Sequence, residues 1–267
     1  MSSEVVAAIC AAVVAVISAT VTVYGQIRIA RLQDELTRQR EERSREAQSQ
    51  ALVARYRDPL LRSAFDLQSR IYNIAAQSIL TIYRTDPPQT QRYIVENTLY
   101  VIAEFLGWVE IMRRDVQFLD LGSVERSRRL NTLLDAITRT FFATQYPVSF
   151  RLFRGQQRAI GELMIVPRRQ NGQEVQDECM GYAAFARRLQ DDPRFAEWFE
   201  GLRQDIGRLI DDRDRHVARL IALQHALIDL IDFLDPDQVR IPPHDRQKLP
   251  LQQATPAAPD TARPHTP

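Results

Sequence analysis

Apolar residues follow two distinct patterns along this chain. From Val5 to Tyr24 they form one run of 20 residues without a charged side chain, including seven valines and two isoleucines. A helix of that length spans about 30 Å, which is the thickness of the hydrocarbon core of a bilayer. The run therefore predicts a single transmembrane helix, a membrane anchor within residues 1–27. No Lys or Arg precedes the run, which distinguishes it from a cleavable signal peptide.

The second pattern is a helical stripe, in which apolar residues recur every three or four positions between residues 58 and 235. Asp58-Pro59 and Asp192-Pro193 have the composition of helix starts. No alternation of strands and helices is evident, so the expected fold class is all-α, with a helical, bundle-like soluble domain. The stripes predict helices at about residues 58–86, 90–114, 123–144, 156–165, 177–189 and 202–234, and a further short helix that begins at Asp192-Pro193 and includes Trp198 and Phe199. The string PRRQNGQE predicts an exposed loop.

Residues 28–57 contain no Gly or Pro and carry eight arginines and five acidic residues, which predicts a helical juxtamembrane stalk. Ile29, Leu32 and Leu36 begin a coiled-coil seam that fades after them. This leaves open both a homodimer through the stalk and a solvated single helix. Arginines follow the apolar run, whereas only Glu4 precedes it. The positive-inside rule then predicts an N-terminus outside the cell membrane and a cytoplasmic domain.

The end of the chain differs in composition from the domain before it. Eight of the 14 prolines lie in residues 236–267, where no apolar periodicity is present. This composition predicts a disordered Pro-rich tail. The sequence thus predicts an anchor at 1–27, a stalk at 28–57, an α-helical domain at 58–235 and a disordered tail at 236–267.

Charge and cysteine content exclude several classes of protein. The chain has a net charge of +1, and residues 58–235 contain 23 arginines against 25 acidic residues. A nucleic-acid-binding domain would normally be clearly basic, so we expect no nucleic-acid partner. With only Cys10 and Cys179 available, a disulfide framework is excluded. We expect Cys179 to act as a small buried apolar residue near the start of a helix.

Motifs for metals, cofactors and catalysis are missing from the sequence. His216 and His225 are nine residues apart on one predicted helix and therefore do not share a face as a metal pair would. No phosphate-binding loop, dinucleotide fingerprint or nucleophile elbow occurs. We therefore predict no metal, no cofactor and no catalytic residue.

The strongest polar cluster lies in the string RGQQRAIGELM and consists of Arg154, Gln157, Arg158 and Glu162. Arg154 and Arg158 are four residues apart, so their like charges share one helix face and repel unless something neutralises them. One interpretation is a binding site for an anion. The other is a structural ion-pair network in which Glu162 is the neutralising partner.

A second polar cluster lies along the apolar stripe of the first predicted helix of the domain. Gln68, Arg70 and Asn73 are its members. Buried amides and guanidinium groups need hydrogen-bond partners, so we expect these residues to fix the packing between helices.

Four strings resemble those of an uncharacterised family of bacterial α-helical proteins that often carry an N-terminal membrane segment. They are YRDPLLRSAFDLQSRIYN, EFLGWVEIMRRDVQFLDLG, RGQQRAIGELM and LIDLIDFLDP, and they span residues 56–236. The resemblance implies a single helical domain and implies no activity and no catalytic residue.

Two functions from different classes fit these features. The first is a non-enzymatic, membrane-tethered interaction module that binds a protein partner in the cytoplasm. The alternative is a membrane-proximal enzyme or binding protein for an anionic small molecule or lipid headgroup, with Arg154, Gln157, Arg158 and Glu162 as its site. A pocket lined by these residues would favour the alternative, and a solid core would favour the first.

Overall fold

The structure is a computed structural model that describes residues 55–115, 124–170 and 173–250, together with residues 24, 26, 28, 33, 35–40 and 43. Contacts within the chain divide it into two units, Met1–Ala51 and Leu52–Pro267. Apart from Tyr24, the predicted membrane helix lies outside the described residues, as do most of the stalk and residues 251–267. Within the described part of the chain, no helix is long and apolar enough to cross a membrane.

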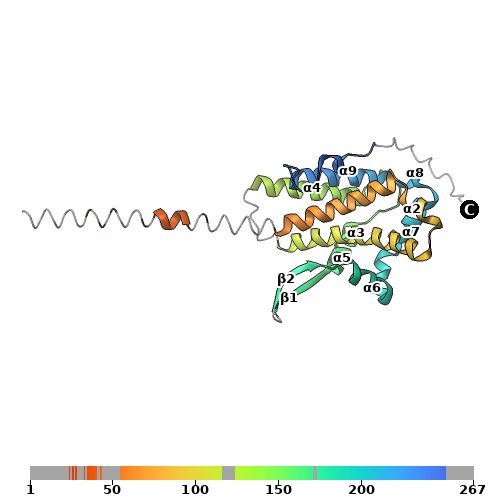
Figure 1. Ribbon diagram of the computed structural model, residues 1–267, viewed down its shortest axis with the longest axis horizontal. Helices are drawn as coiled ribbons and strands as arrows, with labels where there is room; N and C mark the ends of the chain where they lie inside the picture. The colour runs from red at the N-terminus through yellow and green to blue at the C-terminus, as the bar shows by residue number, and fades with distance from the viewer. Residues whose placement is uncertain are drawn as a thin grey trace, which may run out of the picture. The chain divides into compact units, whose positions relative to one another are not determined.

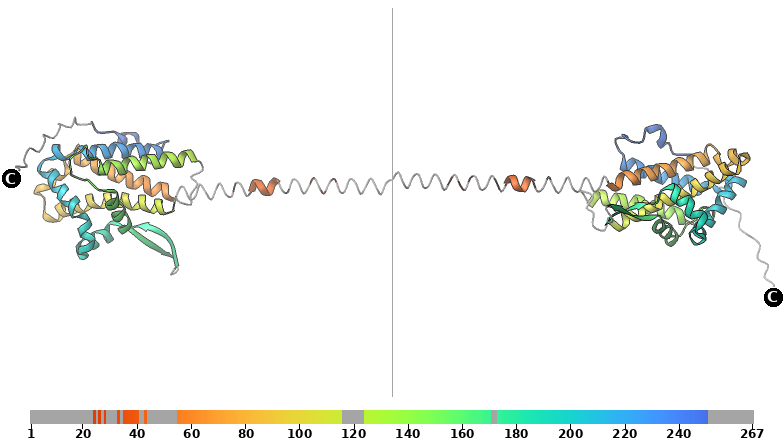
Figure 2. Two further views of the ribbon diagram at one scale, coloured as in Figure 1. Left: turned by 180° about the vertical axis from the view of Figure 1, so that it is seen from behind. Right: turned by 60° about the horizontal axis from the view of Figure 1, so that its bottom comes forward.

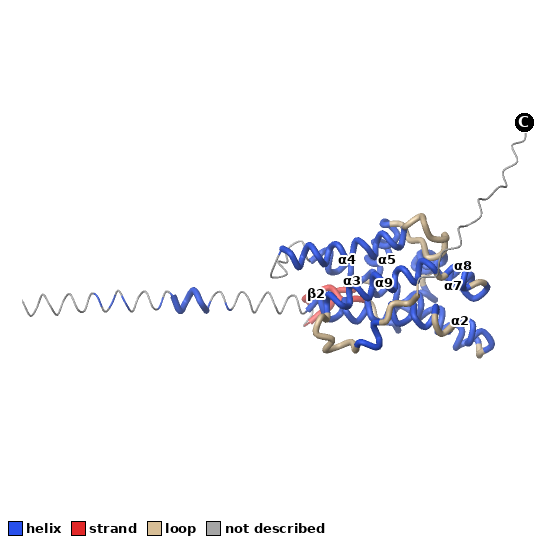
Figure 3. Tube along the Cα trace, turned by 90° about the horizontal axis from the view of Figure 1, so that it is seen from above, coloured by secondary structure: helices blue, strands red, loops and turns tan. Residues whose placement is uncertain are grey.

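The second unit is mostly helical, as the sequence predicts. Figure 1 shows the axis of the helix of residues 55–75 (orange) roughly parallel to the axes of the helices labelled α3, α4 and α9, and Figure 3 shows the same predominance of helix from above. After residues 55–75, the elements are α2 (Ile79–Ile82), η1 (Tyr83–Thr85), α3 (Pro88–Asp115), α4 (Val124–Phe142), α5 (Arg154–Leu163), β1 (Ile165–Gln170), β2 (Gln173–Cys179), α6 (Tyr182–Asp191), α7 (Pro193–Asp211), α8 (Arg213–His216), α9 (Ala218–Leu234) and η3 (Pro243–Arg246).

A β-hairpin replaces the loop and the first turn of a helix that the sequence predicts around residue 177. Strands β1 and β2 pair antiparallel, with Ile165 opposite Cys179, and the hairpin lies on the α3–α5 side of the domain (Figure 2, left). Cys179 is therefore on a strand, and α6 begins only at Tyr182. The dipeptide Asn171-Gly172 between the strands was the available sequence signal, because it favours tight hairpin turns.

Several predicted helix boundaries are also wrong. The first helix of the domain, predicted to reach residue 86, ends at residue 75 and is followed by α2 and η1. Residues 55–58 are already helical, so Asp58-Pro59 does not start the first helix of the domain. The short helix predicted after Asp192-Pro193 continues through residue 202 as α7, and the rest of the helix predicted over residues 202–234 is divided into α8 and α9. The helices are interrupted at Asp212 and at Val217. The side chain of Asp212 accepts a hydrogen bond from the backbone N–H of Arg215 and so caps α8.

The largest difference from the sequence prediction is at the end of the domain, where residues 236–250 are packed and not disordered. Ile241 and Leu249 are buried against the core. Two buried glutamines bind this segment through its backbone: Gln68 donates to the carbonyl of Asp245, and the amide oxygen of Gln224 accepts the N–H of Leu249. Side chains of the helices beneath it thus hold this segment, which contains a turn after Asp235 and the short helix η3.

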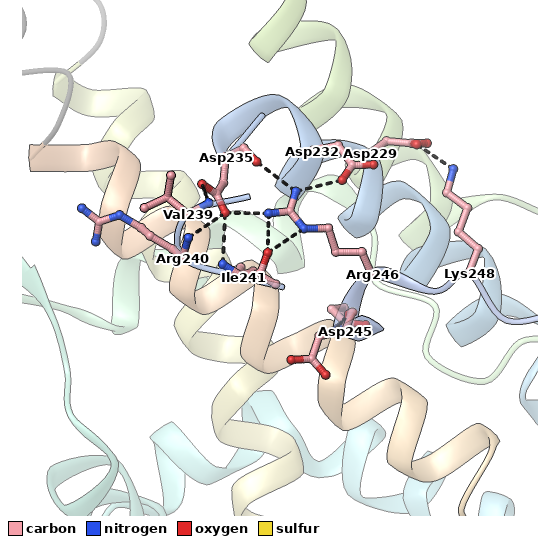
Figure 4. A network of polar contacts seen from close by, with 10 residues as sticks. Asp229, Asp232, Asp235, Val239, Arg240, Ile241, Asp245, Arg246 and Lys248 are labelled. Carbon is pink, nitrogen blue, oxygen red and sulfur yellow. Dashed lines mark hydrogen bonds and ion pairs between the residues drawn. The ribbon is translucent and has the colours of Figure 1, made fainter. Parts of the chain in front are cut away.

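Arg246 attaches the same segment to the end of α9. Its guanidinium lies among Asp232, Asp235 and the carbonyl of Ile241, and it forms hydrogen bonds to all three (Figure 4). Arg246 and Asp235 are both almost fully buried, with side-chain exposures of 5% and 8%. A charged pair at this depth is tolerated because both of its members form further hydrogen bonds to the surrounding backbone.

A second buried arginine joins α4 to α9. Arg219, at the start of α9, is fully buried and donates to five backbone carbonyls at 2.7–3.0 Å. Two of these carbonyls, those of Thr140 and Phe141, belong to the last turn of α4, where a positive charge is favoured by the helix dipole. Burial and the nearby Arg151 nevertheless lower the pKa of Arg219 to about 10.

Candidate functional site

A cavity of about 480 Å³ lies between α3, α4 and α5. This volume falls within the range of ligand pockets in proteins, about 300–1,000 Å³. Helices α3 and α4 contribute both apolar and polar side chains, whereas α5 contributes polar side chains alone. The lining residues are Phe105, Leu106, Val109, Glu110, Met112 and Arg113 from α3, Asn131, Leu134, Asp135, Ile137 and Thr138 from α4, and Arg154, Gln157 and Arg158 from α5.

A close approach of α5 to α3 positions the polar side of this cavity. Gly161 of α5 lies against α3, and a Cβ at this position would be 2.6 Å from the carbonyl oxygen of Leu106. Only glycine permits that separation without a shift of the backbone. One turn and two turns earlier on the same helix, Arg158 and Arg154 face the cavity.

The buried amide of Gln157 holds the beginning of α5 in place. It donates to the carbonyl of Leu152 at 2.8 Å and to that of Thr138, on α4, at 3.1 Å. Gln156 accepts the backbone N–H of Phe153 and so caps the same helix end. Gln157 therefore links α5 to α4, and its two donors are already satisfied within the protein.

Glu110 is the buried carboxylate of the site, with only 3% of its side chain exposed. Arg113 donates two hydrogen bonds to it, at 2.6 and 2.8 Å, whereas Arg158 approaches it only to 4.0 Å. Burial by itself would raise the pKa of Glu110. The hydrogen bonds from Arg113 and Arg114 and the charge of Arg158 outweigh that effect, so the pKa lies below its ordinary value.

Arg154 and Arg158 do not form a buried ion-pair network with Glu162. The side chains of Arg154 and Arg158 are 61% and 56% exposed, and Arg158 approaches Glu162 only to 3.9 Å. Arg154 instead donates to Asp135 of α4 at 3.0 Å, and Arg139 approaches the other oxygen of the same carboxylate at 2.7 Å. Of the four residues that the sequence predicts, three line the cavity, and Glu162 contacts it only through Arg158.

Sequence reasoning missed the residues that α3 and α4 contribute to the site. Glu110, Arg113 and Asp135 are more than 15 positions away from α5 in the sequence, and only the packing of three helices brings them together. One signal was present: Glu110 lies beside Val109 within the apolar stripe of its helix, where a charged residue needs a partner.

A second group of titratable side chains lies where the middle of α3 meets β2. Burial raises the pKa of Glu104, as does the negative charge of Asp66, whereas a hydrogen bond from Tyr100 lowers it. Burial and the charge of Glu104 raise the pKa of Cys179 to about 12, so its thiol is protonated at neutral pH. This agrees with a packing role for Cys179, whose sulfur packs so closely on Gly107 that a Cβ at that position would be only 2.7 Å away from it.

The second predicted cluster is divided in the structure. Gln68 is buried and binds the segment after α9, in agreement with a role in packing. Arg70 donates instead to Asn97 on α3. Over the described ranges, no group of three or more His, Cys, Asp or Glu side chains lies close enough together to bind a metal ion.

No protein-family model, no curated protein and no solved structure matches this chain. The resemblance of four sequence strings to a family of bacterial helical proteins therefore has no counterpart in these comparisons. The fold and the site place the protein in a general class, that of helical domains with an apolar cavity bordered by arginines.

Proposed function

We propose that the domain binds a small anionic ligand in the α3–α4–α5 cavity, and that residues 5–24 hold the domain at the inner face of a membrane. The observation that carries the proposal is the lining itself. Three arginines and two carboxylates border an apolar interior, which leaves one positive charge in excess at the cavity. Guanidinium groups bind carboxylates and phosphates through paired hydrogen bonds, which makes arginine the residue expected at an anion site.

The energetics of Arg154 and Arg158 support binding over a structural role. Ion pairs between exposed side chains contribute only about 0–1 kcal/mol to folding. The contacts of Arg158 are also long, at 3.9 and 4.0 Å. These two arginines therefore add little to stability, and an anion between them would relieve their mutual repulsion. A protein partner in the cytoplasm remains the prediction made from the sequence, and a ligand-binding domain is compatible with one.

Thermal melting of the full-length chain with a panel of anions tests the proposal. We expect at least one carboxylate or phosphate compound to raise the melting temperature, because a ligand at a hundredfold excess over its Kd stabilises the folded state by about 2.7 kcal/mol. The variant carrying both Arg154→Ala and Arg158→Ala should fold normally and lose this response. Arg203→Ala, on an exposed arginine of α7 outside the cavity, is the matched control and should retain it.

Two results would contradict the proposal. One is a double variant that responds to the anion as strongly as the wild type does. The other is a loss of about 3–5 kcal/mol of stability in Arg158→Ala without ligand, which is the result expected for a broken buried ion pair.

A further inference from the structure

We infer that the ligand of this cavity is an anionic amphiphile, a single aliphatic chain that ends in a carboxylate or a phosphate. This inference rests on the proposed function and adds to it the chemical class of the ligand. It follows from the distribution of apolar and charged side chains around the cavity, and from the freedom of two arginines to exchange their partners.

The apolar part of the lining is too large for a simple anion. Phe105, Leu106, Met112 and Ile137 are buried, and two further apolar side chains are half-buried around them: Val109 and Leu134. An inorganic anion would leave this apolar surface uncovered. A hydrocarbon chain would remove it from water, at about 25 cal/mol per Å² of surface.

The charged lining side chains of α3 and α4 are already ion-paired: Glu110 with Arg113, and Asp135 with Arg139. The lining charges that a headgroup can reach are those of Arg154 and Arg158, which both come from α5 and are four residues apart on its exposed face. The side chains of these two arginines are more than half exposed, so they can bind a headgroup without being desolvated in advance. A chain within the cavity and a headgroup at α5 together match both parts of the lining.

Both arginines can turn to a ligand without leaving a carboxylate unpaired. If Arg154 leaves Asp135, Arg139 still approaches that carboxylate at 2.7 Å. If Arg158 turns away from Glu110, the two short hydrogen bonds from Arg113 remain. The exchange therefore avoids the large penalty of a buried, unpaired charge.

Two sources could supply such a ligand: the free pool of fatty acids and alkyl phosphates, or single-chain lipids of a membrane. Both present the same chemistry, an aliphatic chain with one anionic headgroup. The predicted anchor at residues 5–24 would tether the domain to a membrane that holds the second source.

Photocrosslinking of the full-length chain in phosphatidylcholine nanodiscs, with a diazirine derivative of decanoate, tests the inference. The label should map to cavity-lining peptides of α3 and α4. Unlabelled decanoate and decyl phosphate should displace it, whereas butyrate, inorganic phosphate and decanol should each be at least about tenfold weaker. Each additional buried methylene should tighten competition about three- to fourfold. Lysophosphatidic acid added to the nanodisc tests the membrane source. A decrease in photolabelling with either decanoate or lysophosphatidic acid supports the inference.

Variants separate the chain from the headgroup. Leu134→Trp fills the cavity and leaves the arginines intact, so it should abolish labelling; Val109→Phe is a milder second variant if the first does not fold. The variant with Arg154→Ala and Arg158→Ala should reduce the affinity for decanoate to that for decanol, whereas Arg203→Ala should change neither.

The outcomes distinguish this inference from the proposed function. If butyrate or phosphate competes as well as decanoate, the aliphatic chain is not recognised: the inference is overturned, and the anion site stands. If decanol competes as well as decanoate, the anionic headgroup is not recognised, and both the inference and the proposed function are overturned. Both are also overturned if no label reaches α3 or α4 and no anion raises the melting temperature.

Discussion

Arg246 donates to Asp235 across 2.5 Å, and this pair joins the end of α9 to the segment that follows it. The carboxylate of Asp235 also accepts the backbone N–H groups of Val239, Arg240 and Ile241 (Figure 4). Burial raises the pKa of Asp235, but these hydrogen bonds and the charge of Arg246 outweigh it, so the pKa lies below its ordinary value. One carboxylate therefore organises the turn that returns the chain to the helices.

Substitution of Arg246 should strongly destabilise the domain. Arg246→Ala leaves a buried carboxylate without its charged partner, and we expect a loss of about 3–5 kcal/mol in the free energy of unfolding. Urea unfolding of the full-length chain measures the change. Lys248→Ala is the control, because Lys248 pairs with Asp229 at an exposed position and should contribute less than about 1 kcal/mol. Equal effects of the two substitutions would contradict this account.

Removal of residues 236–250 should also destabilise the domain. A chain that ends at residue 235 loses the buried side chains of Ile241 and Leu249, whose burial stabilises the fold by about 1.5–3 kcal/mol each. The buried amides of Gln68 and Gln224 also lose the hydrogen-bond partners that this segment provides. A chain that ends at residue 250 retains all of these contacts. We expect the melting temperature of the shorter chain to be lower by at least several degrees. Indistinguishable melting curves would support the disorder that composition predicts for this segment.

Arg219 should be among the least replaceable residues of the domain. Arg219→Ala leaves buried carbonyls at the end of α4 without a hydrogen-bond donor, so we expect a loss of at least about 3 kcal/mol in the free energy of unfolding. Arg219→Lys keeps the charge but presents three donors where the guanidinium presents five, and it should recover only part of that loss. Circular dichroism during urea unfolding checks the order of the three proteins. Full stability of the lysine variant would show that charge alone is required.

The sequence predicts those parts of the fold that depend on local patterns. The stripes at residues 90–114 and 123–144 correspond to α3 and α4 within a few residues, because an amphipathic helix is encoded within its own segment. The hairpin at Ile165–Cys179 escaped detection, because its short strands contain many charged residues and little apolar alternation.

Long-range contacts account for what the sequence does not predict. Arg219 and Arg246 resemble ordinary surface arginines in the sequence, and only packing shows that both are buried. The same is true of the site. Arg154, Gln157 and Arg158 are close together on one helix and could be identified, whereas the apolar walls of the cavity come from α3 and α4.

Glu104 provides a pH-dependent prediction. Its pKa is raised by burial and by Asp66, despite the hydrogen bond from Tyr100, so folding disfavours its ionised form. A carboxyl group of this kind stabilises the fold fully below its unfolded pKa of about 4.3, and this stabilisation is lost as the pH rises through the higher folded pKa. Glu104→Gln should therefore increase the free energy of unfolding at pH 7, and the increase should vanish toward pH 4. Glu197→Gln, at an exposed position on α7, controls for the loss of one negative charge.

The reactivity of the Cys179 thiol tests the charge of Glu104 without a measurement of unfolding. Burial raises the pKa of Cys179 to about 12, and the charge of Glu104 contributes to the rise, so removal of that charge should lower the pKa. In a Cys10→Ala background, where Cys179 is the only thiol, Glu104→Gln should therefore speed alkylation by iodoacetamide at pH 9, because the thiolate is the reacting form. Glu197→Gln should leave the rate unchanged. If Glu104→Gln stabilises the protein without changing the alkylation rate, the stabilisation comes from packing and not from the removal of a charge beside Cys179.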